Sequence, residues 1–90
     1  MKITSDHHHN TTILTIDCKG STAVKAVGVG VINCEDPILS RPFVAITWAS
    51  GDTWGYRLPS TPLLLALLGE KSVGQFANAV KREATFATCQ

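Results

Sequence analysis

The chain has 90 residues, of which 44% are hydrophobic and 17% charged, with a formal net charge of +1. This length supports one modest hydrophobic core and excludes a second, while the apolar content excludes a chain that is disordered throughout. The balanced charge argues against a protein built mainly to bind phosphate backbones, because such proteins usually carry a strong basic excess.

The first residues are polar and show no apolar period. We expect a flexible N-terminal arm, or an edge segment, over residues 1–11 and a single domain over residues 12–90. The opening does not resemble a secretory signal, and the longest apolar run, residues 62–69, is far shorter than the roughly 20 residues of a membrane helix. We therefore expect a cytoplasmic protein that does not engage membranes.

Cysteine spacing agrees with that compartment. Cys18, Cys34 and Cys89 are far apart, odd in number and without a C-x-x-C pair. A small secreted domain usually has a denser and even set, so we expect reduced thiols.

Four segments are predicted to be β-strands: 13–18, in which apolar residues alternate, 24–33, 42–48 and 53–58. In the second segment Gly28 and Gly30 share one face, which leaves room there for another backbone or a bulky ring. A loop is predicted over residues 34–41. Ser50-Gly51-Asp52 is turn chemistry and predicts that the last two strands form a hairpin.

Two helices are predicted after Pro59. Thr61 is the expected N-cap of a short helix. Pro62 is at the first helical position, residues 63–68 follow it, and Gly69 closes the helix. Ser72 and Gln75 have the spacing of a capping box for a second helix. Its apolar stripe consists of Val73, Phe76, Ala77, Val80 and Ala84. The predicted fold is α+β: a small curved antiparallel sheet of three to four strands followed by two C-terminal helices.

Residues 24–86 carry a family resemblance. Trp48 is followed by the turn Ser50-Gly51, then by Trp54-Gly55-Tyr56, Leu58-Pro59 and the element Ser72-Val73-Gly74-Gln75-Phe76. This order resembles the KTSC domain, named after the C-terminus of some lysyl-tRNA synthetases, whose pattern has Y-x-Y, V-P and S-x-G-x-F-N at these points. The chain departs from it at Trp54, at Ala77 in place of the Asn, and in a longer loop over residues 34–41.

The resemblance implies a small α+β domain. RNA binding has been suggested for the family, and no enzymatic activity is attached to it. It supports the predicted fold more than any one function.

Catalytic machinery is not evident. His7, His8 and His9 all lie in the expected arm, which is a poor base for preorganised chemistry, and the acidic pair Glu35-Asp36 falls on a loop. Asp6 with the three histidines could bind a divalent metal, but no distal ligand completes a set. We expect no catalysis, no metal site and no cofactor.

Two binding hypotheses remain. Leucines go almost all round the first helix, and exposed apolar patches mark protein interfaces, so Leu63, Leu64, Leu67 and Leu68 are the candidate partner-binding residues unless another segment covers them. The partner would be another protein or a second copy of the chain. A compact, near-neutral chain fits an adaptor or inhibitor from a bacteriophage or mobile element that engages a host factor.

The alternative is a single-stranded RNA or DNA binder. Trp54 and Tyr56 share one strand face, where aromatic rings can stack unpaired bases, and the nearby cations Arg57, Lys81 and Arg82 complete the candidate set. Arg57 is expected to point to the opposite face. The competing interpretation of the rings is that helices bury them in the core.

Overall fold

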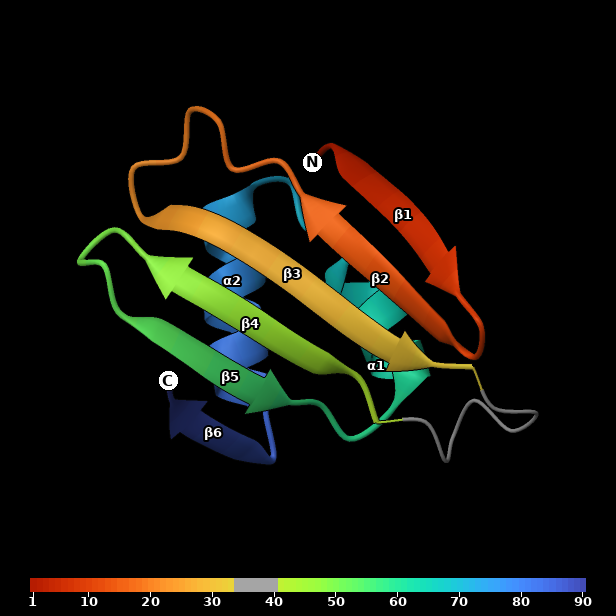
Figure 1. Ribbon diagram of the computed structural model, residues 1–90. Helices are drawn as coiled ribbons and strands as arrows, with labels where there is room; N and C mark the ends of the chain where they lie inside the picture. The colour runs from red at the N-terminus through yellow and green to blue at the C-terminus, as the bar shows by residue number, and fades with distance from the viewer. Residues whose placement is uncertain (34–40) are drawn as a thin grey trace.

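The computed structural model describes residues 1–33 and 41–90 of the chain. Within these residues six strands form one sheet in sequence order, and every neighbouring pair is antiparallel (Figure 1). The strands are β1 (Ile3–His8), β2 (Thr11–Ile16), β3 (Val24–Ile32), β4 (Phe43–Trp48), β5 (Thr53–Arg57) and β6 (Phe86–Cys89). Helices α1 (Thr61–Leu67) and α2 (Val73–Glu83) lie between β5 and β6. The loop predicted over residues 34–41 falls, apart from Arg41, outside the described residues.

The predicted strand count of three to four is wrong, although the α+β class holds. The four predicted strands are present as β2 to β5, and the sheet gains one strand at each edge. β1 comes from the segment expected to be a flexible arm or an edge segment, and β6 follows the helices, so the predicted order of strands first and helices last is wrong. Both additions pair with an edge strand of the four predicted strands, and this pairing orders them without an apolar pattern of their own.

β1 could not be predicted from the apolar pattern of the sequence. All six of its residues are exposed, so no apolar alternation marks it. Its ladder with β2 runs from Ile3 opposite Ile16 to His8 opposite Thr11. His9 closes the hairpin turn with a positive φ of 54°, a left-handed conformation that few residues other than glycine adopt. Backbone pairing, and not side-chain burial, holds this segment.

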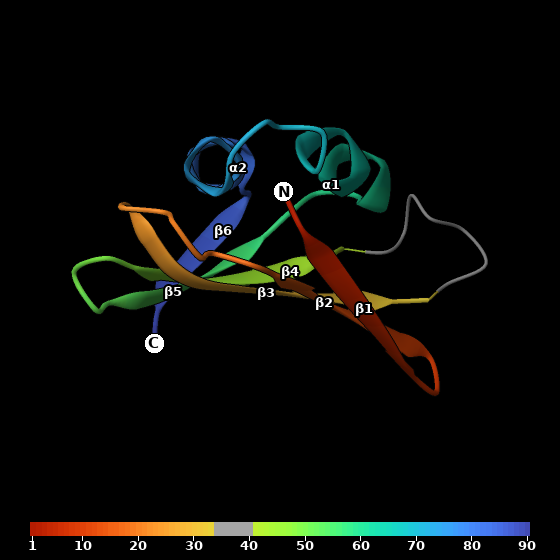
Figure 2. The same ribbon diagram turned by 90° about the horizontal axis from the view of Figure 1, so that it is seen from above.

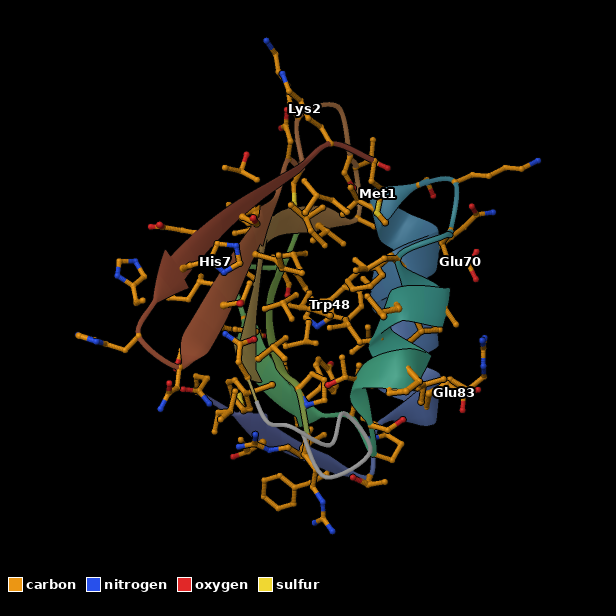
Figure 3. The ribbon with its side chains drawn as sticks, turned by 90° about the vertical axis from the view of Figure 1, so that its right-hand side faces the viewer. Met1, Lys2, His7, Trp48, Glu70 and Glu83 are labelled. Atoms are coloured by element: carbon orange, nitrogen blue, oxygen red, sulfur yellow. The ribbon has the colours of Figure 1, made fainter. Side chains whose placement is uncertain are left out.

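Both helices pack on one face of the sheet, which curves around them (Figures 2 and 3). The alternation of each strand points Val29 of β3, Val44 and Ile46 of β4 and Tyr56 of β5 into this layer, all at most 2% exposed. From the helices, Leu64 and Phe76 meet them and are equally buried. The core is therefore a two-layer sandwich of sheet and helices.

The helix starts are set by serine caps. Ser72 Oγ accepts a hydrogen bond from the Gln75 backbone N–H at 3.2 Å, which confirms the predicted start of α2. For α1 the predicted cap was one residue late, since Ser60 Oγ accepts from the Leu63 N–H at 3.4 Å and Thr61 is the first helical residue. Among the described residues, no helix has the length and apolarity needed to cross a membrane.

The other face of the sheet is not covered by a helix (Figure 2). Small residues run across its middle, with Gly28 opposite Ala45 and Ala45 opposite Gly55. A Cβ added to Gly28 would meet no atom within 4 Å, whereas one added to Gly55 would overlap the ring of Phe43. A bulky ring therefore does approach a glycine on this face, but the glycine is Gly55 and the ring is that of Phe43 in the same chain.

Candidate functional site

A cleft of about 490 Å³ opens between the β4–β5 hairpin, the middle of α2 and β6. It is lined by Trp48, Ser50, Asp52, Trp54, Tyr56, Asn78, Lys81 and Ala87. β4 and β5 supply the three rings, the hairpin turn supplies Ser50 and Asp52, and α2 supplies Asn78 and Lys81. Figure 3 shows Trp48 between the sheet and the helix layer.

The aromatic rings form the floor and walls of the cleft. Trp54 and Tyr56 are alternate residues of β5, so their side chains share a face, and their rings stack with centroids 6.5 Å apart and planes 23° apart. Trp48 Nε1 donates a hydrogen bond to the Tyr56 hydroxyl at 3.3 Å. Tyr56 is only 2% exposed, while both indoles are half-buried. The tyrosine is therefore a fixed floor, and the tryptophans offer ring surface to a ligand.

Charged and polar groups stand at the rim. Lys81 Nζ lies 5.9 Å from the centroid of the Trp48 ring, within the range of a cation–π contact. On the opposite side, Ser50 Oγ donates to Asp52 Oδ2 at 3.3 Å, at the turn where Gly51 adopts a φ of 100°. The cleft combines flat apolar walls with one ammonium, one carboxylate and the amide of Asn78. These groups can hold a planar ring and fix its edge by hydrogen bonds.

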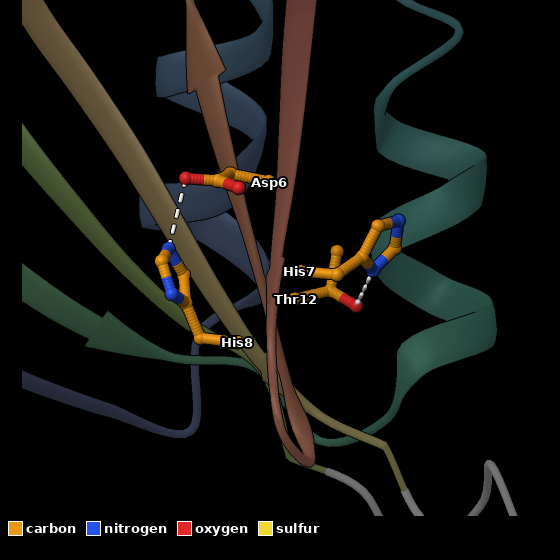
Figure 4. A network of polar contacts seen from close by, with 4 residues as sticks. All are labelled: Asp6, His7, His8 and Thr12. Carbon is orange, nitrogen blue, oxygen red and sulfur yellow. Dashed lines mark hydrogen bonds and ion pairs between the residues drawn. The ribbon is translucent and has the colours of Figure 1, made fainter.

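The histidines lie elsewhere, on β1 and its turn (Figure 4). His7 Nδ1 is 3.0 Å from Thr12 Oγ1, and His8 Nε2 is 2.8 Å from Asp6 Oδ2, both on the surface. Among the described residues, no three His, Cys, Asp or Glu side chains are grouped so that they could hold a metal ion. The sequence-based expectation that this chain holds no metal stays a prediction.

Cys18 follows β2 and is half-buried. Burial raises the pKa of its thiol above the ordinary value of 9.0, and the neighbouring Asp17 carboxylate raises that pKa further, against a smaller lowering by a backbone hydrogen bond from Val27. The sulfur is therefore protonated at neutral pH and is a poor nucleophile.

The structure brings together three of the five residues predicted to bind nucleic acid, namely Trp54, Tyr56 and Lys81. Arg57 points to the uncovered face, where its guanidinium lies 5.0 Å from the Phe43 ring centroid and donates to the Arg41 carbonyl at 2.9 Å. Arg82 is exposed and forms an ion pair with Glu83 at 3.4 Å. Arg57 lies outside the cleft because successive residues of β5 point to opposite faces of the sheet. Arg82 lies outside it because successive residues of a helix point in different directions.

Trp48, Asn78 and the hairpin turn were not among the predicted site residues. Trp48 shares a strand face with Val44 and Ile46, so the alternation of β4 could have placed it beside the other rings. Asn78 lies three residues before Lys81 on α2, a spacing that puts both on one helix side. Ser50 and Asp52 of the hairpin turn had no comparable spacing that could have placed them beside the rings.

The leucines predicted to bind a partner mostly face inward. Leu64 and Leu67 are 1% and 7% exposed, and Leu63 and Leu68 are half-buried against the core. The outward leucine is Leu65, at 62% exposure, which was not in the predicted set. The sheet and α2 together bury more of the circumference of α1 than the single stripe expected of a surface helix.

Comparison with known proteins found no matching family model, no similar curated protein and no similar solved structure. The resemblance to the KTSC domain therefore stays a prediction. The cleft has to be interpreted from its own geometry.

Proposed function

We propose that this protein is a small non-catalytic binding module for single-stranded RNA or DNA, and that its cleft takes up one unpaired base. The observation that supports the proposal is the convergence of Trp48, Trp54, Tyr56 and Lys81 on one cleft of about 490 Å³. That volume lies in the range of small-ligand sites. Each base–aromatic stack contributes roughly 1–3 kcal/mol, and stacking tolerates any base because all have a π-face.

Five of the residues that line the cleft have a role in this proposal. The base stacks on the exposed surface of Trp54, which the Tyr56 ring supports from behind. Asn78 and Asp52 offer a donor and acceptors to the base edge, and Lys81 offers its ammonium to the adjoining phosphate. With a chain charge of only +1, binding is expected to be weak and only moderately dependent on salt.

Protein binding through α1, the first hypothesis from the sequence, has less support. Two of its four leucines, Leu64 and Leu67, belong to the core, so their surface is not available to a partner. Leu65 alone is too small a patch to mark an interface, because single exposed apolar residues are common on monomers.

The test is a fluorescence titration of the tryptophans with a mixed-sequence single-stranded oligonucleotide, on Trp54→Ala and Trp54→Phe. Losing one stack predicts binding about tenfold weaker for Trp54→Ala, whereas the phenyl ring of Trp54→Phe keeps most of the affinity. Leu65→Ala, on the exposed side of α1, is the control with unchanged affinity, and circular dichroism shows that each variant is folded. Unchanged affinity in folded Trp54→Ala, or no binding by the wild type, would refute the proposal.

A further inference from the structure

A second cavity of about 490 Å³ lies at the same end of the sheet as the cleft. The two residues before β1, the turn between β2 and β3 and the start of α2 form its walls. Three lysines, Lys2, Lys19 and Lys71, line it, with Asp17 as the single acidic residue. We call it the lysine cavity. The side chains that line it carry a charge excess of two, in a chain whose net charge is +1.

Within the part of the chain that the structure describes, none of these three lysines forms an ion pair. The ion pairs that the described residues make are His8 with Asp6 and Arg82 with Glu83, and neither involves this cavity. Asp17 uses Oδ1 to accept the backbone N–H of Lys19 at 2.9 Å. Lys2 also borders a neighbouring pocket together with Lys25, which adds a fourth cation at this end of the sheet. Three lysines around one cavity, with a single carboxylate among them, attract an anion.

The lysine cavity adjoins the aromatic cleft. The two hairpin turns lie side by side, because Ala49 N donates to the Ala23 carbonyl at 2.8 Å, and Ala23 lines the lysine cavity. Val24 at the start of β3 pairs with Trp48 of the cleft. On α2, Gly74 lines the cavity and Asn78 lines the cleft, about 6 Å further along the helix axis. A ligand longer than one nucleotide can therefore reach both.

We propose that the lysine cavity holds the phosphate groups of the nucleotides next to the base in the cleft, so that the chain binds a short track of single strand and not an isolated nucleotide. This inference rests on the proposed function of the cleft. Surface lysines bind a lone phosphate weakly, but a phosphate tethered to a stacked base arrives at a high effective concentration. The arrangement also explains how a nearly neutral chain binds a polyanion: its cations are gathered where the strand passes.

The test compares adenosine, a tetranucleotide and inorganic phosphate as ligands of the full chain. In Lys19→Gln/Lys71→Gln we expect about tenfold weaker binding of the tetranucleotide at low salt, and a salt slope of log affinity reduced by roughly 1.4, or 0.7 per lost contact. Adenosine has no phosphate, so its affinity should not change. The matched control, Arg41→Gln/Arg82→Gln, removes the same charge outside both sites and should keep the slope.

The outcomes separate the two proposals. If the lysine variant keeps the wild-type affinity and slope, or loses no more than the arginine control, the lysine cavity is not part of the track. If Trp54→Ala keeps full tetranucleotide affinity, the cleft proposal fails whatever the lysines do. Inorganic phosphate that binds as tightly as the tetranucleotide at equal ionic strength would show a site for free phosphate and overturn the inference of a strand track.

Discussion

The two faces of the sheet differ sharply although the same strands build both. On the helix-covered face, Val29, Val44 and Ile46 are at most 1% exposed, and on the uncovered face their strand neighbours include Gly28, Gly30 and Ala45. Stability is thus concentrated in one layer of large side chains, while the other face carries little that packs. The candidate binding residues lie in the middle of neither face. They lie at the margin of the helix layer, where the rings of the cleft are packed on one side and partly exposed on the other.

The largest expected effect comes from a charge on the covered side. Leu64→Asp places a carboxylate at a position that is 1% exposed, which should cost more than about 4 kcal/mol and unfold most of a small domain. Leu65→Asp on the same helix, at 62% exposure, should change stability by less than about 0.5 kcal/mol. Urea unfolding followed by circular dichroism gives both values. Equal losses in the two variants would contradict the assignment of the inner side of α1.

A smaller effect separates the two faces within one strand. Ile16 of β2 is 2% exposed on the covered face, so Ile16→Thr should cost roughly 2 kcal/mol by burying a hydroxyl and losing a methylene. Ile13 lies on the uncovered face at 41% exposure, and Ile13→Thr should cost at most about 0.5 kcal/mol. The comparison is made by thermal unfolding. A cost for Ile13→Thr as large as that for Ile16→Thr would mean that something covers this face in solution.

The smallest effect concerns two glycines of the uncovered face. Gly55→Ala should cost about 1 kcal/mol, because the new Cβ overlaps the Phe43 ring, which must move from its contact with Arg57. Gly28→Ala meets no atom and should stabilise by up to about 0.5–1 kcal/mol through lower chain entropy. Chemical denaturation measures both. The control measures Gly55→Ala again in a Phe43→Ala background. Without the ring, the penalty of Gly55→Ala should disappear.

Much of the fold could be predicted from local pattern. The alternation of β2 to β5, the hairpin turn at Gly51 and the Ser72 cap all act within a few residues of each other, and all are present. β1 and β6 could not be found in this way, because residues such as Asp6 and Thr88 show no apolar period and are ordered by pairing with a strand already in place. The inward turn of Leu64 and Leu67 likewise depends on the width of the sheet below them.

The candidate site likewise has features that local sequence predicts and features that depend on the tertiary structure. Sequence by itself determined that Trp54 and Tyr56 share a face, that Arg57 points away, and that Ser72 caps α2, because strand alternation and helix capping are local geometry. Only the tertiary structure decided that Lys81 stands over Trp48, and that Lys2, Lys19 and Lys71 line one cavity beside them. These residues are far apart in the chain, and a cleft or a charge cluster arises only when packing of the whole core closes the distance between them.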